Sequence, residues 1–237
     1  MWSLPLVMSG LVLGACASAG SGGAPADGRT DDDAAIDAVP IDAPPQAVTL
    51  SQNQSPTPNG QSFACSQTPG NYTRENSYYR VFQLSDHGIT GTLQFSQVSF
   101  AVQQANAGGV AVTQAAQLKI GAYGGTAGGS SIDLAQITPI TATAVSIPDS
   151  GTSVVNVPIT GSITGGNLVV ELAIPDGAAA QNVFFIGTNA AGETKPGYIR
   201  SPICNVVTPT GMNGLGAAQN PPLPKADIIM SVTGVHF

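Results

Sequence analysis

From residue 60 onward, apolar and polar residues alternate in short runs that are separated by Gly, Pro, Asn and Asp. The first run covers residues 78–84 and places Tyr78, Phe82 and Leu84 on one face. Similar runs follow at residues 93–102, 118–122, 137–147, 155–159, 168–174, 183–188 and 228–237. A period of two residues is typical of strands with one buried face. The best helical pattern, over residues 101–116, is weak and is broken by Gly108 and Gly109, so the pattern predicts an all-β domain.

The run over residues 93–102 changes phase within itself. Leu93 and Phe95 share one parity, whereas Val98, Phe100 and Val102 share the other. A slip of one residue would turn every later side chain to the opposite face, unless the strand absorbs an extra residue. The pattern therefore predicts a β-bulge or a bend between sheets near residues 96–97.

The spacing of these runs predicts the architecture. About eight short strands with turn residues between them favour an antiparallel two-sheet β-sandwich of jelly-roll type. The run over residues 137–147 contains Pro139, which suits an edge strand. The glycine-rich residues 124–129 are expected to form a flexible loop. A transmembrane barrel is disfavoured because the strands lack girdles of aromatic residues.

The N-terminus carries a different kind of signal. An apolar run over residues 4–13 leads into Leu13-Gly14-Ala15-Cys16, which resembles the lipobox of bacterial lipoproteins. This resemblance implies that residues 1–15 are a removed signal peptide and that acylated Cys16 anchors the chain to a lipid bilayer. Ala17 follows the cysteine, and by the same resemblance this implies the outer membrane of a Gram-negative bacterium, facing the periplasm or the exterior. An ordinary signal peptide with an incidental cysteine and a buried core segment are the alternatives.

Residues 16–46 are predicted to form a disordered tether. This segment is rich in Ala, Gly, Ser, Asp and Pro, lacks aromatic residues and includes Asp31, Asp32 and Asp33 in a row. Such a composition buries too little apolar surface to offset the entropy of ordering. The segment resembles the Asp-Ala-Pro stalks of some Gram-negative lipoproteins. The predicted organisation is therefore a leader (1–15), a lipidated tether (16–46) and a β-sandwich domain (47–237).

The charge distribution argues against one class of function, nucleic-acid binding, and the cysteines predict a covalent link. The formal net charge of −7 comes mostly from the tether, and the domain is nearly neutral, without the basic stripe that nucleic-acid binding requires. No nucleic-acid partner is expected. Cys65 and Cys204 are the remaining pair of cysteines in a chain expected to be exported, where thiols are normally oxidised, and we predict that they form a disulfide.

The residues that catalysis would need are few. His87 and His236 are the only histidines, and no Gly-x-Ser-x-Gly elbow accompanies them. The remaining candidates are Glu171 and Glu193, as general acid and base for glycoside hydrolysis. The sequence therefore favours a protein that is not an enzyme and that carries no cofactor.

Binding is the better supported class. A jelly-roll sandwich often binds sugars on a concave face, where exposed aromatic rings stack on the ligand. The aromatic candidates are Tyr72, Tyr79, Tyr123 and Tyr198, and we predict Tyr79, Tyr123 and Tyr198 as ligand contacts. No metal site is predicted; the oxygen ligands that could hold a structural calcium are Asp149, Asp176, Asn189 and Glu193.

Two segments of the domain, residues 76–82 and 182–194, together with residues 168–171, resemble a β-sandwich module of secreted bacterial proteins. That resemblance implies fold and location, and it implies no activity. The expected function is a membrane-anchored envelope lipoprotein whose non-catalytic sandwich binds a protein or glycan ligand or mediates adhesion. The alternative is a carbohydrate-binding or glycoside-active surface protein.

Overall fold

The computed structural model describes residues 44–60, 62–218, 222 and 225–237. The chain divides into two units, Met1–Ile41 and Asp42–Phe237, and every described residue belongs to the second. The predicted signal peptide, the lipidation site at Cys16 and nearly all of the predicted tether lie outside the described residues. Among the described residues, no helix has the length and apolar character needed to cross a membrane.

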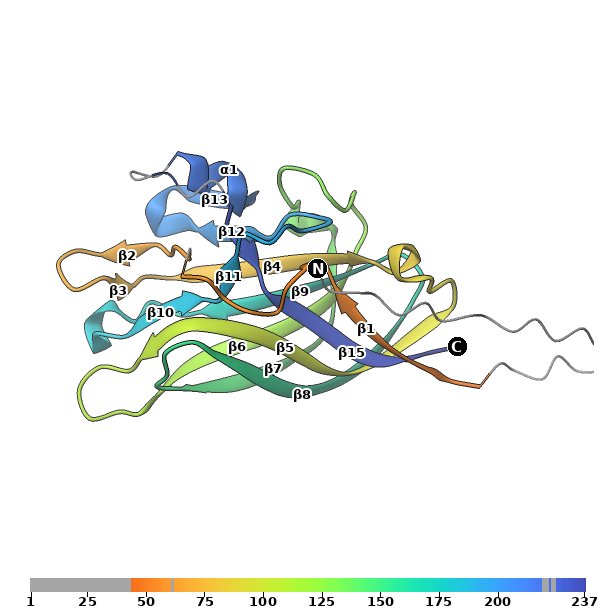
Figure 1. Cartoon of the computed structure of the whole chain (residues 1–237), viewed down its shortest axis with the longest axis horizontal. Helices are drawn as coiled ribbons and strands as arrows, with labels where there is room; N and C mark the ends of the chain where they lie inside the picture. The colour runs from red at the N-terminus through yellow and green to blue at the C-terminus, as the bar shows by residue number, and fades with distance from the viewer. Residues whose placement is uncertain (1–43, 61, 219–221, 223–224) are drawn as a thin grey trace, which may run out of the picture. The chain divides into compact units, whose positions relative to one another are not determined.

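Two antiparallel sheets form the body of this unit (Figure 1). The first contains β1 (Gln46–Ser51), β15 (Met230–His236), β5 (Thr92–Asn106), β8 (Ser153–Thr164) and β10 (Val183–Ile186). The second has the order β13 (Val206–Gly211), β12 (Tyr198–Ser201), β4 (Asn76–Gln83), β9 (Asn167–Ile174), β6 (Thr113–Tyr123) and β7 (Ile137–Pro148).

Short elements complete the described fold. The strands β2 (Ser66–Gln67) and β3 (Tyr72–Thr73) form a hairpin, and β11 (Thr188–Asn189) pairs with β14 (Asp227–Ile228). The helix α1 (Met212–Ala217) follows β13. Four 3-10 turns are also present in the described residues: η1 (Leu84–His87), η2 (Leu134–Gln136), η3 (Ala178–Ala180) and η4 (Pro202–Cys204).

The connections are those of a jelly roll, which confirms the predicted fold. One sheet has the order β1-β15-β5-β8 and the other contains β4-β9-β6-β7, while the chain crosses between sheets from β4 to β5, β5 to β6, β7 to β8 and β8 to β9. The strand position beside β5 is shared, because β15 pairs with its first part and β10 with its end. Beyond β4, the strands β12 and β13 widen the second sheet.

The alternation in the sequence builds the core between the sheets. Tyr78 and Phe82 of β4 meet Phe95 and Phe100 of β5 in one large cluster of buried side chains. The phase change within β5 is accommodated as predicted, because its pairing with β8 shifts register between Phe95 and Gln97. This bulge keeps the apolar residues on both sides of it pointing into the core.

Two further expectations can be compared with the structure. The strand containing Pro139 is an edge of its sheet, as predicted, since β7 pairs only with β6 among the described strands. The weak helical pattern over residues 101–116 forms no helix, in agreement with the all-β prediction. Residues 101–106 continue β5, and residues 113–116 begin β6, because the burial of alternate residues outweighs a weak helical periodicity.

Candidate functional site

The outer face of the second sheet carries a groove. Tyr79, Glu171 and Lys119 lie opposite one another on β4, β9 and β6, so their side chains share this face, whereas the neighbouring Tyr78 and Leu172 point into the core. The groove has a volume of about 480 Å³. Its lining consists of Glu75, Ser77, Ala115, Ala116, Gln117, Lys119, Glu171, Ala173, Ile174, Pro175, Asp176 and Arg200. The small alanine side chains in this set leave the space above the strands open.

A second, apolar hollow adjoins the groove. It has a volume of about 280 Å³ and is lined mostly by Ile120, Ile137, Pro139, Ile140 and Val169. Lys119 and Glu171 line both cavities, so the two form one path across β9, β6 and β7. A ligand that followed this path would meet polar groups first and an apolar hollow next.

Ion pairs surround the polar part of this groove. Glu171 Oε1 lies 3.3 Å from Lys119 Nζ and accepts a hydrogen bond of 2.9 Å from Ser77 Oγ. On the β12 side, Arg200 Nη1 lies 3.5 Å from Glu75 Oε1. The side chains of Lys119 and Glu75 are 42% and 46% exposed, so a ligand can reach them, and exposed ion pairs of this kind exchange partners at little cost.

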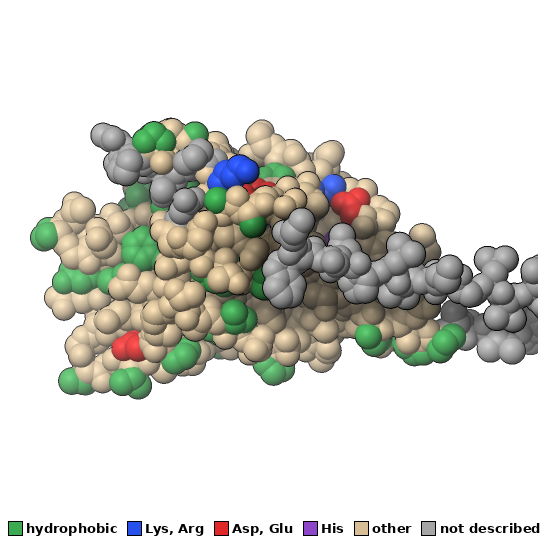
Figure 2. All heavy atoms as spheres, viewed as in Figure 1, with side chains coloured by type: hydrophobic (Ala, Val, Ile, Leu, Met, Phe, Trp, Pro, Cys, Tyr) green, Lys and Arg blue, Asp and Glu red, His purple; other side chains and the backbone are tan. Residues whose placement is uncertain are grey.

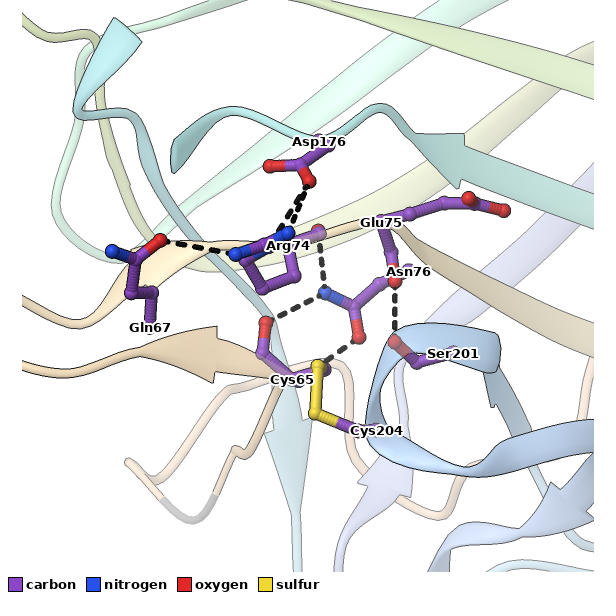
Figure 3. The surroundings of a disulfide bond; sticks show 8 residues. All are labelled: Cys65, Gln67, Arg74, Glu75, Asn76, Asp176, Ser201 and Cys204. Carbon is purple, nitrogen blue, oxygen red and sulfur yellow. Dashed lines mark hydrogen bonds and ion pairs between the residues drawn. A yellow bond between two sulfur atoms is a disulfide. The ribbon is translucent and has the colours of Figure 1, made fainter. Parts of the chain in front are cut away.

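The disulfide lies beside this part of the groove and confirms the predicted pairing of Cys65 with Cys204 (Figure 3). The Asn76 side chain is hydrogen-bonded to both the N–H and the carbonyl of Cys65. Ser201 Oγ donates to the carbonyl of Glu75. These contacts hold the start of β4 against the end of β12 and so keep Glu75 near Arg200. Arg74 and Asp176 form a third ion pair, at 3.0 Å, at the same end of the sheet.

The three tyrosines predicted as ligand contacts are buried. Tyr79, Tyr123 and Tyr198 are only 2%, 6% and 1% exposed, and they form a second small core with Val81, Ile132 and Val169 on the outer face of the sheet. Residues 124–136, which include the glycine-rich loop expected to be flexible, supply the cover. Burial raises the pKa of Tyr198 to about 12, and its hydroxyl donates to the carbonyl of Gly129 at 2.9 Å. No ring of the three is free to stack on a ligand.

A buried polar cluster around Arg80 lies on the opposite, inner face of β4. The Arg80 side chain is fully buried, and Nη1 lies 2.7 Å from Glu193 Oε2. It also donates to the carbonyls of Ile228 and Lys195 and to the side chains of Gln52 and Asn53. Burial lowers the pKa of the guanidinium, and the adjacent carboxylates oppose that effect.

Two carboxylates of this cluster share the Asn213 amide. The Asn213 amide of α1 donates to Glu193 at 2.9 Å and to Asp227 at 3.0 Å. Burial, together with the charge of Asp227, raises the pKa of Glu193 to about 7 against the pull of Arg80. The cluster joins the segment after β1, the loop before β12, α1 and β14, so its role is to hold these segments together. Sequence reasoning missed it, although Arg80 has the same parity as the core residues Tyr78 and Phe82.

The remaining predicted residues do not form a catalytic pair. Glu171 lies on the outer face of the sheet and Glu193 is ion-paired to Arg80 on the inner face, so they do not flank one substrate. His87 lies in η1 with its ring 6.4 Å from that of Phe82, and burial lowers its pKa. Neither histidine lines the groove.

The four oxygen ligands proposed for calcium are occupied in other ways. Asp149 accepts from the N–H of Ala107 at 2.6 Å, and Asp176 is paired with Arg74. Asn189 donates to the carbonyl of Ser55 at 2.7 Å, and Glu193 is bound to Arg80. Within the described part of the chain, no group of three or more His, Cys, Asp or Glu side chains could hold a metal ion.

Comparison with family models, with curated proteins and with solved structures found no match to this chain.

Proposed function

We propose that this protein is a lipid-anchored envelope protein that binds a ligand in the outer groove without catalysing a reaction. The lipobox-like residues 13–16 and the acidic tether support the anchor, and Cys16 would attach the chain to the outer membrane of a Gram-negative bacterium. The observation that carries the binding role is the groove itself, where reachable ion pairs adjoin an apolar hollow.

Several contacts favour binding over catalysis. Each carboxylate that lines the groove has a cationic partner: Glu75 has Arg200, Glu171 has Lys119 and Asp176 has Arg74. No histidine lines the groove beside Ser77, and Glu171, the carboxylate that accepts the Ser77 hydroxyl, is paired with Lys119. Glycoside hydrolysis needs one protonated and one ionised carboxyl group, whereas all three groove carboxylates are paired with cations, which favours their ionised forms.

The chemistry of the groove favours an extended peptide as the ligand. Its charged side chains are of both signs, which suits the charged and amide groups of a peptide. The hollow lined by Ile137, Ile140 and Val169 suits an apolar side chain. A glycan ligand would rely on stacking, and the buried tyrosines supply no platform. The carboxylates Glu75, Glu171 and Asp176 could still accept hydrogen bonds from sugar hydroxyls, so glycan binding is the second candidate.

The anchor is tested by measuring the intact mass of the protein from the membrane fraction. Wild type is expected to carry acyl chains on Cys16 as its first residue. A Cys16→Ser variant is expected to lose both the acylation and the membrane attachment. A soluble, unacylated wild-type protein would refute the anchored form of the proposal.

The groove is tested with arrays of extended peptides and of envelope glycans, probed with purified full chain. Peptide binding that falls at least tenfold in Lys119→Glu supports the proposal, because this change places a negative charge beside Glu171. Thr160→Glu, an exposed change on β8 in the other sheet, is the matched control. Binding to glycans alone would favour the second candidate. Binding that both variants retain, or no binding to either array, would refute the groove as the site.

A further inference from the structure

The outer edge of β7 is the longest unprotected strand edge in the described structure. β7 pairs with β6 along its whole length, and no backbone hydrogen bond joins its other side to a described strand. The other edges are shorter or interrupted: β1 spans only Gln46–Ser51, β13 contains Pro209, and β8 contains Pro158 and shifts register near Gly161.

The sequence of β7 lacks the features that normally block such an edge. Natural edge strands are protected by charged side chains, prolines or bulges. In β7 the protection is confined to its ends, where Pro139 sits at a register shift and Pro148 is the last residue. Residues 141–147, with the sequence TATAVSI, contain no charge, no proline and no glycine. Such a segment has high β-propensity and a full set of backbone groups available for pairing.

The exposed side chains of β7 itself are also small and uncharged; the nearest charge on its own sheet is Lys119 of β6, opposite Ala142. Ala142, Ala144 and Ser146 are exposed and small, so they do not hinder the approach of another strand. The next strand, β8, has no charged residue either, and its Val154 is 53% exposed. Figure 2 shows that, apart from one acidic patch at the lower left, the side chains along the lower border of this face, where β8 runs, are uncharged.

We propose that two copies of this chain pair through β7, antiparallel and centred on Ala144, so that the six-stranded sheets become one continuous sheet. A second copy suits this edge because antiparallel pairing of a strand with itself closes by a two-fold axis, which limits the assembly to a dimer. Because residues 141–147 carry no charge, the side chains that face each other across this pairing do not repel. The pairing uses main-chain groups at the edge of the sheet, so this inference does not depend on the anchor or on the ligand of the groove.

Native mass spectrometry of the full chain released from detergent tests this proposal over a range of protein concentrations. Wild type is expected to show a dimer. Ala144→Lys is expected to weaken dimerisation at least tenfold, because the two new charges would face each other at the two-fold axis. Thr208→Lys places the same charge on an exposed position of β13, at the opposite edge of the same sheet, and is expected to leave the dimer intact. Circular dichroism of each variant verifies that the fold is retained.

A crosslink tests which positions face each other in the dimer. Ala144→Cys is expected to give a covalent dimer with a short bismaleimide, whereas Thr208→Cys is not. A wild-type protein that stays monomeric at every concentration would overturn the proposal. A dimer that survives Ala144→Lys, or that is lost only in Thr208→Lys, would also overturn it. So would a complex in which β7 binds a strand of a different protein and not its own copy.

Discussion

We expect the largest loss of stability from a substitution in the buried Arg80 cluster. Replacing Arg80 with Met keeps much of the side-chain volume but removes the guanidinium that Glu193 faces at 2.7 Å. The exposed fractions of the two side chains are 0% and 9%, so water cannot replace the lost partner. Breaking a buried ion pair by removing one member typically costs about 3 to 5 kcal/mol. We therefore expect Arg80→Met to lower the free energy of unfolding by that amount.

Urea unfolding followed by circular dichroism measures this loss, and a double-mutant cycle identifies its source. Glu193→Gln combined with Arg80→Met should be more stable than Arg80→Met alone, because near pH 7 the remaining Glu193 must either stay charged without a partner or bind a proton, and glutamine avoids both costs. Arg80→Lys should also be destabilising, since one ammonium group cannot reach the carbonyls of Ile228 and Lys195 together with Gln52. A loss below about 1 kcal/mol in Arg80→Met, or strict additivity in the cycle, would refute this reasoning.

Three further predictions concern single features of the core. Removing the disulfide by Cys65→Ala with Cys204→Ala should cost about 5 kcal/mol in the chain-entropy model, given the sequence separation of 139; an unchanged urea midpoint would contradict this. The folded state binds the Glu193 proton more tightly than the unfolded state, so stability should fall, by up to about 3 kcal/mol, as the pH rises from 4.5 through about 7. Thermal melts at pH 5 and pH 8 should show this fall in wild type and a much smaller one in Glu193→Gln. The Tyr78 hydroxyl is buried without a hydrogen-bond partner among the described residues, so Tyr78→Phe should be neutral or stabilising by about 1 kcal/mol, and clear destabilisation by chemical denaturation would show that a partner exists.

Local sequence patterns were sufficient to locate most of the long strands and the bulge in β5. Alternation located β4, β5, β6, β8 and β9, because one face of each strand is buried and the side-chain period is two. The phase change near residue 96 predicted the bulge in β5 for the same reason. The short strands β12 and β13 escaped this reasoning, because Pro and Gly residues interrupt their alternation and long-range pairing with β4 determines them.

The candidate site could not be predicted from local sequence patterns, because it is shaped by contacts between distant segments. Alternation places Tyr79, Tyr123 and Tyr198 on the outer face of a sheet, but only the folded loop over residues 124–136 shows that this part of the face is covered. Glu171 and Glu193 are similar in sequence, yet one lines the open groove and the other is buried against Arg80.

The sequence by itself determined the all-β class, the sandwich, the disulfide pairing and the edge position of β7. The strands follow from a side-chain period of two and from the turn residues between them, and Pro139 marks the edge. The disulfide follows because only two cysteines remain after Cys16 is assigned to the lipobox-like motif. Tertiary structure decided which outer face stays open, which charges are buried and which are reachable. Those properties depend on the segments that pack over a strand, and these come from distant parts of the chain.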